Sequence, residues 1–320
     1  NAGGRGYYAL DITDPGNPKG LWELKGGTGT ACIASDAAVD GSQAEDCNIG
    51  LSFGNPMIAK RPADGRWVVI VTSGHNNISP GDGKGHLYVL DAQSGRILQR
   101  ISTPAGDSTT PSGLARINGW VNDATVDNTV RTIYGGDLQG NLWRFQLENV
   151  TNVASDPTDD VPAGSLTLLA QLVDGLGNPQ PITTRPELGD VKGQRVIFVA
   201  TGQLLGISDK YTDQRQSLYA IRDDVNLAQT SPAVFDMKRD AANEITGFVR
   251  QDFTVGTTTR SVASPKPVDF STNFGWFIDL PDGGAGKPSE RVNVDPVLQL
   301  GTLVVPSNVP SDDTCVAGGY

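Results

Sequence analysis

Residues 67–74 read WVVIVTSG, and after a short loop residues 86–95 read HLYVLDAQSG. The first segment is a β-branched run that ends in small residues. The second contains a tyrosine among aliphatic residues and ends in a polar, glycine-containing turn. β-branched and aromatic residues are enriched in strands, and clusters of Asp, Ser and Gly mark turns. The pair therefore predicts two consecutive short strands.

The same two-strand phrase recurs along the chain. Related segments are found at Gly6–Pro18, Arg131–Asp137, Asn141–Asn149, Arg195–Gly202, Ser217–Asp224, Gly275–Gly284 and, more weakly, Gly301–Asn308. One small sheet leaves a face uncovered, whereas sheets stacked radially bury both faces. We therefore predict an all-β fold, a single β-propeller domain over residues 1–320, with a β-sandwich as the alternative. The recurrences indicate about six or seven blades in a complete ring.

The spacing between phrases exceeds the length of a simple blade, which is about 40–50 residues. We assign the excess to irregular loop insertions near residues 27–47 and 149–162. The first and last segments, NAGGRGYYALD and DDTCVAGGY, resemble the interior of a domain. We therefore expect the chain to be a piece of a larger protein that lacks parts of its first and last blades.

The composition excludes several classes of partner. The 320 residues include 39 Gly and 20 Pro, which favour turns over helices, and the formal net charge is −11. An acidic surface repels phosphate backbones and anionic headgroups, so we expect no nucleic-acid partner and no membrane insertion. No apolar run approaches the length needed to cross a bilayer.

The chain has three cysteines. Cys32 and Cys47 flank a polar loop with 14 residues between them, and a disulfide there would contribute roughly 3 kcal/mol by constraining the unfolded chain. We predict this disulfide, which suits an exported protein, with two free thiols in a cytosolic loop as the alternative. Cys315 is left without an assigned partner.

Two motifs resemble catalytic or phosphate-binding sequences. GLSFG at 50–54 matches the G-x-S-x-G nucleophile pattern around Ser52, but Asn-Pro and an extended segment follow it instead of a helix. GDGKGH at 81–86 is rich in glycine, but it lacks the Lys-Ser/Thr pair and the following helix of a phosphate loop. His86 lies inside a strand phrase. We assign no catalytic residue.

One polar stretch has the outline of a cation loop. Asp123, Thr125 and Asp127 occupy alternate positions, and Thr129 follows two residues later. Calcium loops turn every second side chain inward and supply six to eight oxygens. Arg131 stands at position 9 of this pattern, where an oxygen ligand would help, and no Glu stands at position 12. Both a calcium site and a solvated turn are compatible with this pattern.

Five ordered phrases span most of the chain: GGRGYYALDITDPGNP at 3–18, WELKGG at 22–27, GDLQGNLWRF at 136–145, QPITTRPEL at 180–188 and ATGQLLGISDKYTDQRQSLYAI at 200–221. Together they resemble the C-terminal propeller of the PilC/PilY family of type IV pilus tip adhesins and biogenesis factors of Gram-negative bacteria. They occur in the order expected for that family.

The resemblance implies a modified seven-bladed propeller that is exported and displayed at the pilus tip, the cell surface or the outer membrane. It implies a non-enzymatic role with pilins as partners: promoting pilus assembly, opposing retraction and supporting attachment to host or abiotic surfaces. In some members a calcium loop precedes the GDLQGN phrase. Here that loop falls on Asp123, Thr125, Asp127 and Thr129, with Arg131 in place of the final acidic ligand.

Two other functions remain open from the residues alone. Quinone-dependent dehydrogenases also use propellers, although the chain has no adjacent cysteine pair. A purely structural ring without a ligand is the third hypothesis. Cofactor absorbance would favour the enzyme, and calcium calorimetry would separate a regulated module from a structural ring.

Overall fold

A computed structural model describes residues 3–27, 43–147, 165–224, 233–256, 259–262, 264–284 and 286–311. Most of the two predicted insertions, 27–47 and 149–162, lies outside these residues. The described part is built from short strands, with one short 3₁₀ helix, η1 (Ile207–Tyr211). The all-β prediction is confirmed. Among the described residues, no helix is long and apolar enough to cross a membrane.

The chain divides into two compact units. The first comprises Asn1–Asp137 and Arg144–Thr167, and the second comprises Leu138–Trp143 and Leu168–Tyr320. Each unit is described below by itself. The predicted assignment of all 320 residues to one domain stays a prediction.

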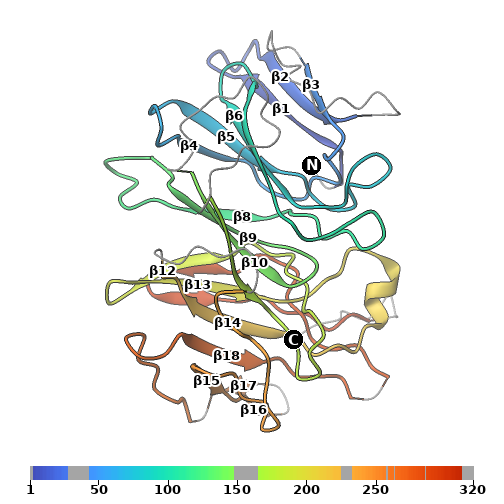
Figure 1. Cartoon of the computed structure of the whole chain (residues 1–320), viewed down its shortest axis with the longest axis vertical. Helices are drawn as coiled ribbons and strands as arrows, with labels where there is room; N and C mark the ends of the chain where they lie inside the picture. Colours follow the sequence, from blue (N-terminus) through green and yellow to red (C-terminus); the bar gives the residue numbers. More distant parts are fainter. Residues whose placement is uncertain are drawn as a thin grey trace. The chain divides into compact units, whose positions relative to one another are not determined.

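The opening sequence phrase forms the centre of a four-stranded antiparallel sheet in the first unit (Figure 1). The strand order is β4 (Met57–Lys60), β5 (Trp67–Thr72), β6 (His86–Asp91) and β7 (Ile97–Ser102). Nearly every side chain of β5 and β6 is buried. Such continuous burial, rather than alternation, is what a sheet covered on both faces requires.

The N-terminal sheet has the order β1 (Gly6–Asp11), β2 (Lys19–Gly26) and β3 (Gln43–Asp46). Its inner face packs against the neighbouring sheet, and the shared core contains Tyr7, Trp22, Leu24, Ile49, Val69, Val71, Tyr88 and Leu90. Two hydrogen bonds align the layers: the Tyr7 hydroxyl donates to the Thr72 carbonyl at 3.0 Å, and Trp22 Nε1 donates to the Ala92 carbonyl at 3.0 Å. A small sheet that buries one face against the next sheet agrees with the predicted stacking of small sheets.

A further sheet has the order β11–β10–β9–β8. Its strands are β8 (Ile117–Trp120), β9 (Thr132–Gly136), β10 (Asn141–Gln146) and β11 (Leu166–Gln171). The GDLQGNLWRF phrase supplies the turn between β9 and β10 and then most of β10. The division between the two units passes through β10 and β11.

The second unit contains a five-stranded sheet (Figure 1). Four strands form an antiparallel series: β12 (Glu187–Val191), β13 (Gln194–Ala200), β14 (Ser217–Arg222) and β18 (Gly275–Asp279). The fifth, β15 (Phe248–Gln251), pairs in parallel with β18. The long connection between β14 and β18, which contains β15, was not predicted from the sequence.

Two smaller hairpins complete the second unit. They pair β16 (Thr254–Val255) with β17 (Arg260–Ser261), and β19 (Val297–Gln299) with β20 (Thr302–Val304). The weak strand phrase at 301–308 is thus confirmed as β20. The number of blades in a complete ring stays a prediction.

Candidate functional site

The predicted cation loop connects β8 to β9 in the first unit and is built from two successive Asp–Thr turns. Asp123 Oδ1 accepts hydrogen bonds from the Thr125 amide at 2.9 Å and from Thr125 Oγ1 at 2.6 Å. Asp127 Oδ1 accepts the equivalent bonds from Thr129 at 3.0 and 2.6 Å. The Asp127 amide donates to the Asp123 carbonyl at 2.8 Å. Aspartate accepting from the second residue along the chain is a common way to fix a tight turn.

Local hydrogen bonds and charges lower the pKa of both carboxylates. The hydrogen bond from the Thr125 side chain is the largest cause that lowers the pKa of Asp123. The pKa of Asp127 is lowered by the hydrogen bond from Thr129 and further by the positive charges of Lys60 and Arg131. The loop is exposed, and its end is joined to β4 because the Lys60 amide donates to the Asn128 carbonyl at 2.9 Å.

These side chains do not by themselves form a calcium coordination shell. They supply two carboxylates and two hydroxyls, and each hydroxyl donates to a carboxylate, whereas calcium takes six to eight oxygen ligands. The positive charges of Lys60 and Arg131 act on Asp127. Among the described residues, no group of three or more His, Cys, Asp or Glu side chains is arranged to hold a metal. Calcium binding at this loop stays a prediction.

Cys47 is disulfide-bonded. Cys32, its predicted partner, lies outside the described residues, as does Cys315, so the pairing itself stays a prediction. Beside Cys47, Asp46 is buried and accepts a hydrogen bond from Arg100 Nη1 at 2.9 Å. This ion pair joins β3 to β7 and was not predicted from the sequence.

The catalytic look-alikes have structural roles. Ser52 Oγ donates to the Gly4 carbonyl at 2.7 Å and accepts from the Gly6 amide at 3.0 Å, so it fixes the start of β1. His86 is buried, with Nε2 2.9 Å from Asp82 Oδ1 and Nδ1 2.7 Å from Ser102 Oγ. The glycine-rich loop at 81–86 is therefore held by a hydrogen bond within the loop, between Asp82 and His86, and by another between His86 and Ser102 of β7.

The second unit contains a buried polar network that sequence reasoning missed. Arg239 lies on the long connection between β14 and β18, and its side chain is 1% exposed. It donates to both oxygens of Asp279 at 2.7 Å and to the Tyr219 hydroxyl at 3.0 Å, and its guanidinium lies 4.8 Å from the centre of the Phe277 ring. Asn243 also donates to Asp279, at 2.9 Å.

The electrostatics of this network follow from burial and pairing. Burial alone would raise the pKa of Asp279, but the hydrogen bonds and charge of Arg239 more than offset it and leave that pKa below its usual value. Burial raises the pKa of Tyr219. The partners of Arg239 lie in segments that are distant in the sequence, so no local sequence pattern indicates this network.

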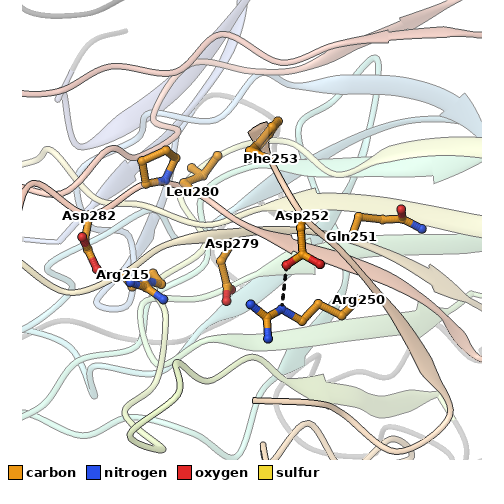
Figure 2. A pocket seen from close by; sticks show the side chains of 9 residues that line it. Arg215, Arg250, Gln251, Asp252, Phe253, Asp279, Leu280 and Asp282 are labelled. Atoms are coloured by element: carbon orange, nitrogen blue, oxygen red, sulfur yellow. Dashed lines mark hydrogen bonds and ion pairs between the residues drawn. The ribbon is translucent and has the colours of Figure 1, made fainter. Parts of the chain in front are cut away.

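Two cavities lie beside this network in the second unit. The first, of about 230 Å³, is lined by Arg215, Arg250, Gln251, Asp252, Phe253, Asp279, Leu280, Pro281 and Asp282. Figure 2 shows Asp279 between the guanidinium groups of Arg215 and Arg250, and Arg250 Nε lies 3.1 Å from Asp252 Oδ1. The second, of about 480 Å³, shares Arg215 and Asp282 with the first. Arg215 and Asp282, which line both cavities, form an ion pair with each other.

Comparison with known protein families identifies the family of this chain. The sequence model of the PilY1 beta-propeller domain matches residues 1–250. The chain belongs to the PilY1 β-propeller family. The propeller prediction and the resemblance to the PilC/PilY family are both confirmed, and the β-sandwich alternative is wrong.

Named members of this family are similar over nearly the whole chain. The type IV pilus biogenesis factor PilY1 of Pseudomonas aeruginosa is 30% identical over 342 residues, which cover 99% of this chain and 27% of that protein. A PilY1 homolog of Xylella fastidiosa is 27% identical over 344 residues, covering 99% of this chain and 20% of that protein. The chain thus spans about a quarter of the length of these relatives.

A solved PilY1 structure supports the same fold. The crystal structure of the Pseudomonas aeruginosa PilY1 C-terminal domain matches with a TM-score of 0.70 at 24% identity, covering 96% of this chain and 62% of that chain. The PilY1-type fold therefore extends over almost all of the sequence, including the residues beyond 250.

Proposed function

We propose that this chain is a non-enzymatic module of type IV pilus biogenesis that promotes pilus assembly, opposes retraction and supports attachment to surfaces or host cells. The observation that carries the proposal is family membership over residues 1–250. The relatives that match nearly the whole chain are named type IV pilus biogenesis factors.

The proposal places the chain outside the cytoplasm, at the pilus tip, cell surface or outer membrane of a Gram-negative bacterium, with pilins as partners. The disulfide at Cys47 supports export, because disulfides form and persist in oxidising compartments. The net charge of −11 disfavours nucleic acid and anionic membranes as alternatives.

The packing supports a scaffold function. Face-to-face sheets and buried strands give a rigid base, and loops on rigid bases commonly carry binding. Ser52 and His86 are engaged in structural hydrogen bonds. The quinoprotein alternative gains no support from the relatives, which are named for pilus biogenesis.

Calcium control through Asp123 and Asp127 is a separate part of the proposal. The alternating turns present both carboxylates at the surface, which supports cation binding. Arg131 and Lys60 oppose it because their positive charges act on Asp127. Calorimetric titration with calcium tests this part independently of pilus assembly.

The main proposal is tested by deleting the segment corresponding to residues 1–320 from the full-length gene and counting surface pili by electron microscopy. We expect pili to be lost, to return with the intact gene, and to return in part when retraction is also blocked. Normal pilus numbers and normal surface attachment in the deletion strain would refute the proposal.

A further inference from the structure

The connection between β13 and β14 exposes three large apolar side chains within seven residues. Leu205, Ile207 and Tyr211 are 41%, 80% and 60% exposed. We call residues 203–215 the Ile207 loop. It contains η1, drawn as the yellow coiled ribbon in Figure 1. Single exposed apolar residues are ordinary, but grouped ones mark interaction surfaces.

The backbone of the Ile207 loop is held in place from within the protein. Arg291, which is 2% exposed, donates to the carbonyls of Gln203 at 3.2 Å and Thr212 at 2.6 Å, and also to that of Asp209. The Asp209 carboxylate in turn accepts from the Leu205 amide at 2.7 Å and from the Gly206 amide at 2.9 Å.

These bonds have a consequence for binding. A buried charge that satisfies several loop carbonyls fixes the loop before any partner arrives. A fixed loop loses little conformational entropy on binding, so its apolar side chains can contribute most of their burial to affinity. Rigid aromatic and aliphatic side chains presented in this way are typical of the anchor residues of protein interfaces.

The Ile207 loop continues into the wall of the 480 Å³ cavity through Asp213, Gln214 and Arg215. Gln214 Nε2 joins this wall to the turn at residues 174–178. It donates to the Pro179 carbonyl at 2.9 Å and to Asp174 Oδ2 at 3.2 Å. Leu176, at the tip of that turn, also lines the cavity and is 89% exposed.

The charge of this cavity is acidic. Its lining carries three carboxylates, Asp174, Asp213 and Asp282, against one guanidinium, Arg215. Asp282 is paired with Arg215, so Asp174 and Asp213 leave an excess of two negative charges. An acidic cavity next to exposed apolar residues is complementary to a surface that has an apolar pocket flanked by basic side chains.

We propose that the Ile207 loop and the adjoining acidic cavity form a docking surface for a partner protein whose matching face carries an apolar pocket flanked by lysine or arginine. Two other occupants are disfavoured. An anionic membrane is repelled by a chain of net charge −11, and a second copy of the chain would bring two acidic cavities together. The inference rests on the proposed function, in which that partner is a pilin.

The test uses the full-length protein in piliated cells, with the photo-crosslinking residue p-benzoylphenylalanine replacing Ile207. Adducts are probed with anti-pilin antibody. The matched control places the same residue at Leu300, which is 97% exposed in the same unit. We expect a pilin adduct from position 207 and not from position 300. Adding Asp213→Lys should reduce the yield from position 207 by about tenfold, because like charges then oppose each other.

The inference is overturned if position 207 gives no pilin adduct, gives an adduct only with a second copy of the chain or with lipid, or gives no more pilin adduct than position 300. A second measurement separates this inference from the proposed function. In a deletion strain that lacks pili, the double variant Ile207→Asp/Tyr211→Asp should fail to restore pili, whereas Leu300→Asp should restore them at equal protein abundance. Full restoration by the double variant refutes the docking surface and leaves the pilus function standing.

Discussion

Replacing Arg239 with methionine should destabilise the second unit more than replacing Arg215 or Arg250, the two arginines that line its cavities. Arg239 gives Asp279 two hydrogen bonds at 2.7 Å, and the Asp279 side chain is only 10% exposed. Without Arg239, the Asp279 carboxylate keeps, within the part of the chain that the structure describes, the hydrogen bonds from Asn243 and Ser217. Removing one partner of a buried ion pair typically costs about 3–5 kcal/mol, because the remaining charge stays buried and unpaired.

The measurement is urea denaturation of the 320-residue chain, followed by tryptophan fluorescence and circular dichroism. The matched control is Arg250→Met, which breaks the pair with Asp252 in the same unit. Asp252 is 54% exposed, so water replaces the arginine, and we expect a loss of at most about 1 kcal/mol. If the two variants lose the same stability, the buried pair is not the stabilising element inferred here.

Acid pH supplies an independent check on the same pair. The pKa of Asp279 in the folded chain is below its usual value, so its contribution to stability is present above the unfolded-state pKa of about 4. That contribution is lost as the pH falls through the folded-state pKa. The stability difference between wild type and Arg239→Met should therefore shrink below about pH 4. A difference that stays constant down to pH 2 would show that the lost interaction is not ionic.

Three other changes give distinct outcomes. Arg131→Asp should tighten calcium binding about tenfold by calorimetry, because it adds a carboxylate and removes an opposing charge; unchanged affinity would show that the assumed ligand register is wrong. Cys47→Ser should cost roughly 3 kcal/mol in thermal or urea unfolding, and reductant should lower the stability of wild type but not that of the variant. Gly275→Ala should cost about 1–3 kcal/mol, because its Cβ would lie 1.9 Å from the Ala220 carbonyl oxygen, whereas Gly20→Ala meets nothing within 4 Å and should be tolerated.

The strands that build the sheets could be predicted because their signal is local. A β-branched run before a small-residue turn and then an aromatic strand gave β5 with β6 and β13 with β14, and both pairs are central in their sheets. Cys47 was also marked correctly as a disulfide cysteine. Each of these features depends on residues within a few positions of one another, or on a residue type with few alternatives.

The features that could not be predicted depend on distant residues. β15 pairs in parallel with β18 across a connection that has no strong strand pattern. The partners of Arg239 come from three separate strands or loops, and Arg291 fixes a loop that lies about eighty residues earlier in the chain. An arginine in a polar segment reads as a solvated surface residue, because only the tertiary fold shows what covers it.

The buried arginines Arg239 and Arg291 of the second unit both bind polar groups near the start of β14. The polar groups at this place explain why charged side chains, and not apolar ones, are buried there. Ser217 and Asp279 are opposite each other at one end of β14 and β18, and Arg239 binds both. The Ile207 loop enters β14 at that same end. Strand ends leave carbonyls and hydroxyls without ladder partners, and these groups need donors once they are buried. Arginine, with five donors in a planar fork, satisfies several at once. Arg239 satisfies groups at this end of the sheet, and Arg291 in the same way satisfies carbonyls of the loop that leads into β14. The rigidity that the proposed docking surface needs comes from these bonds of Arg291.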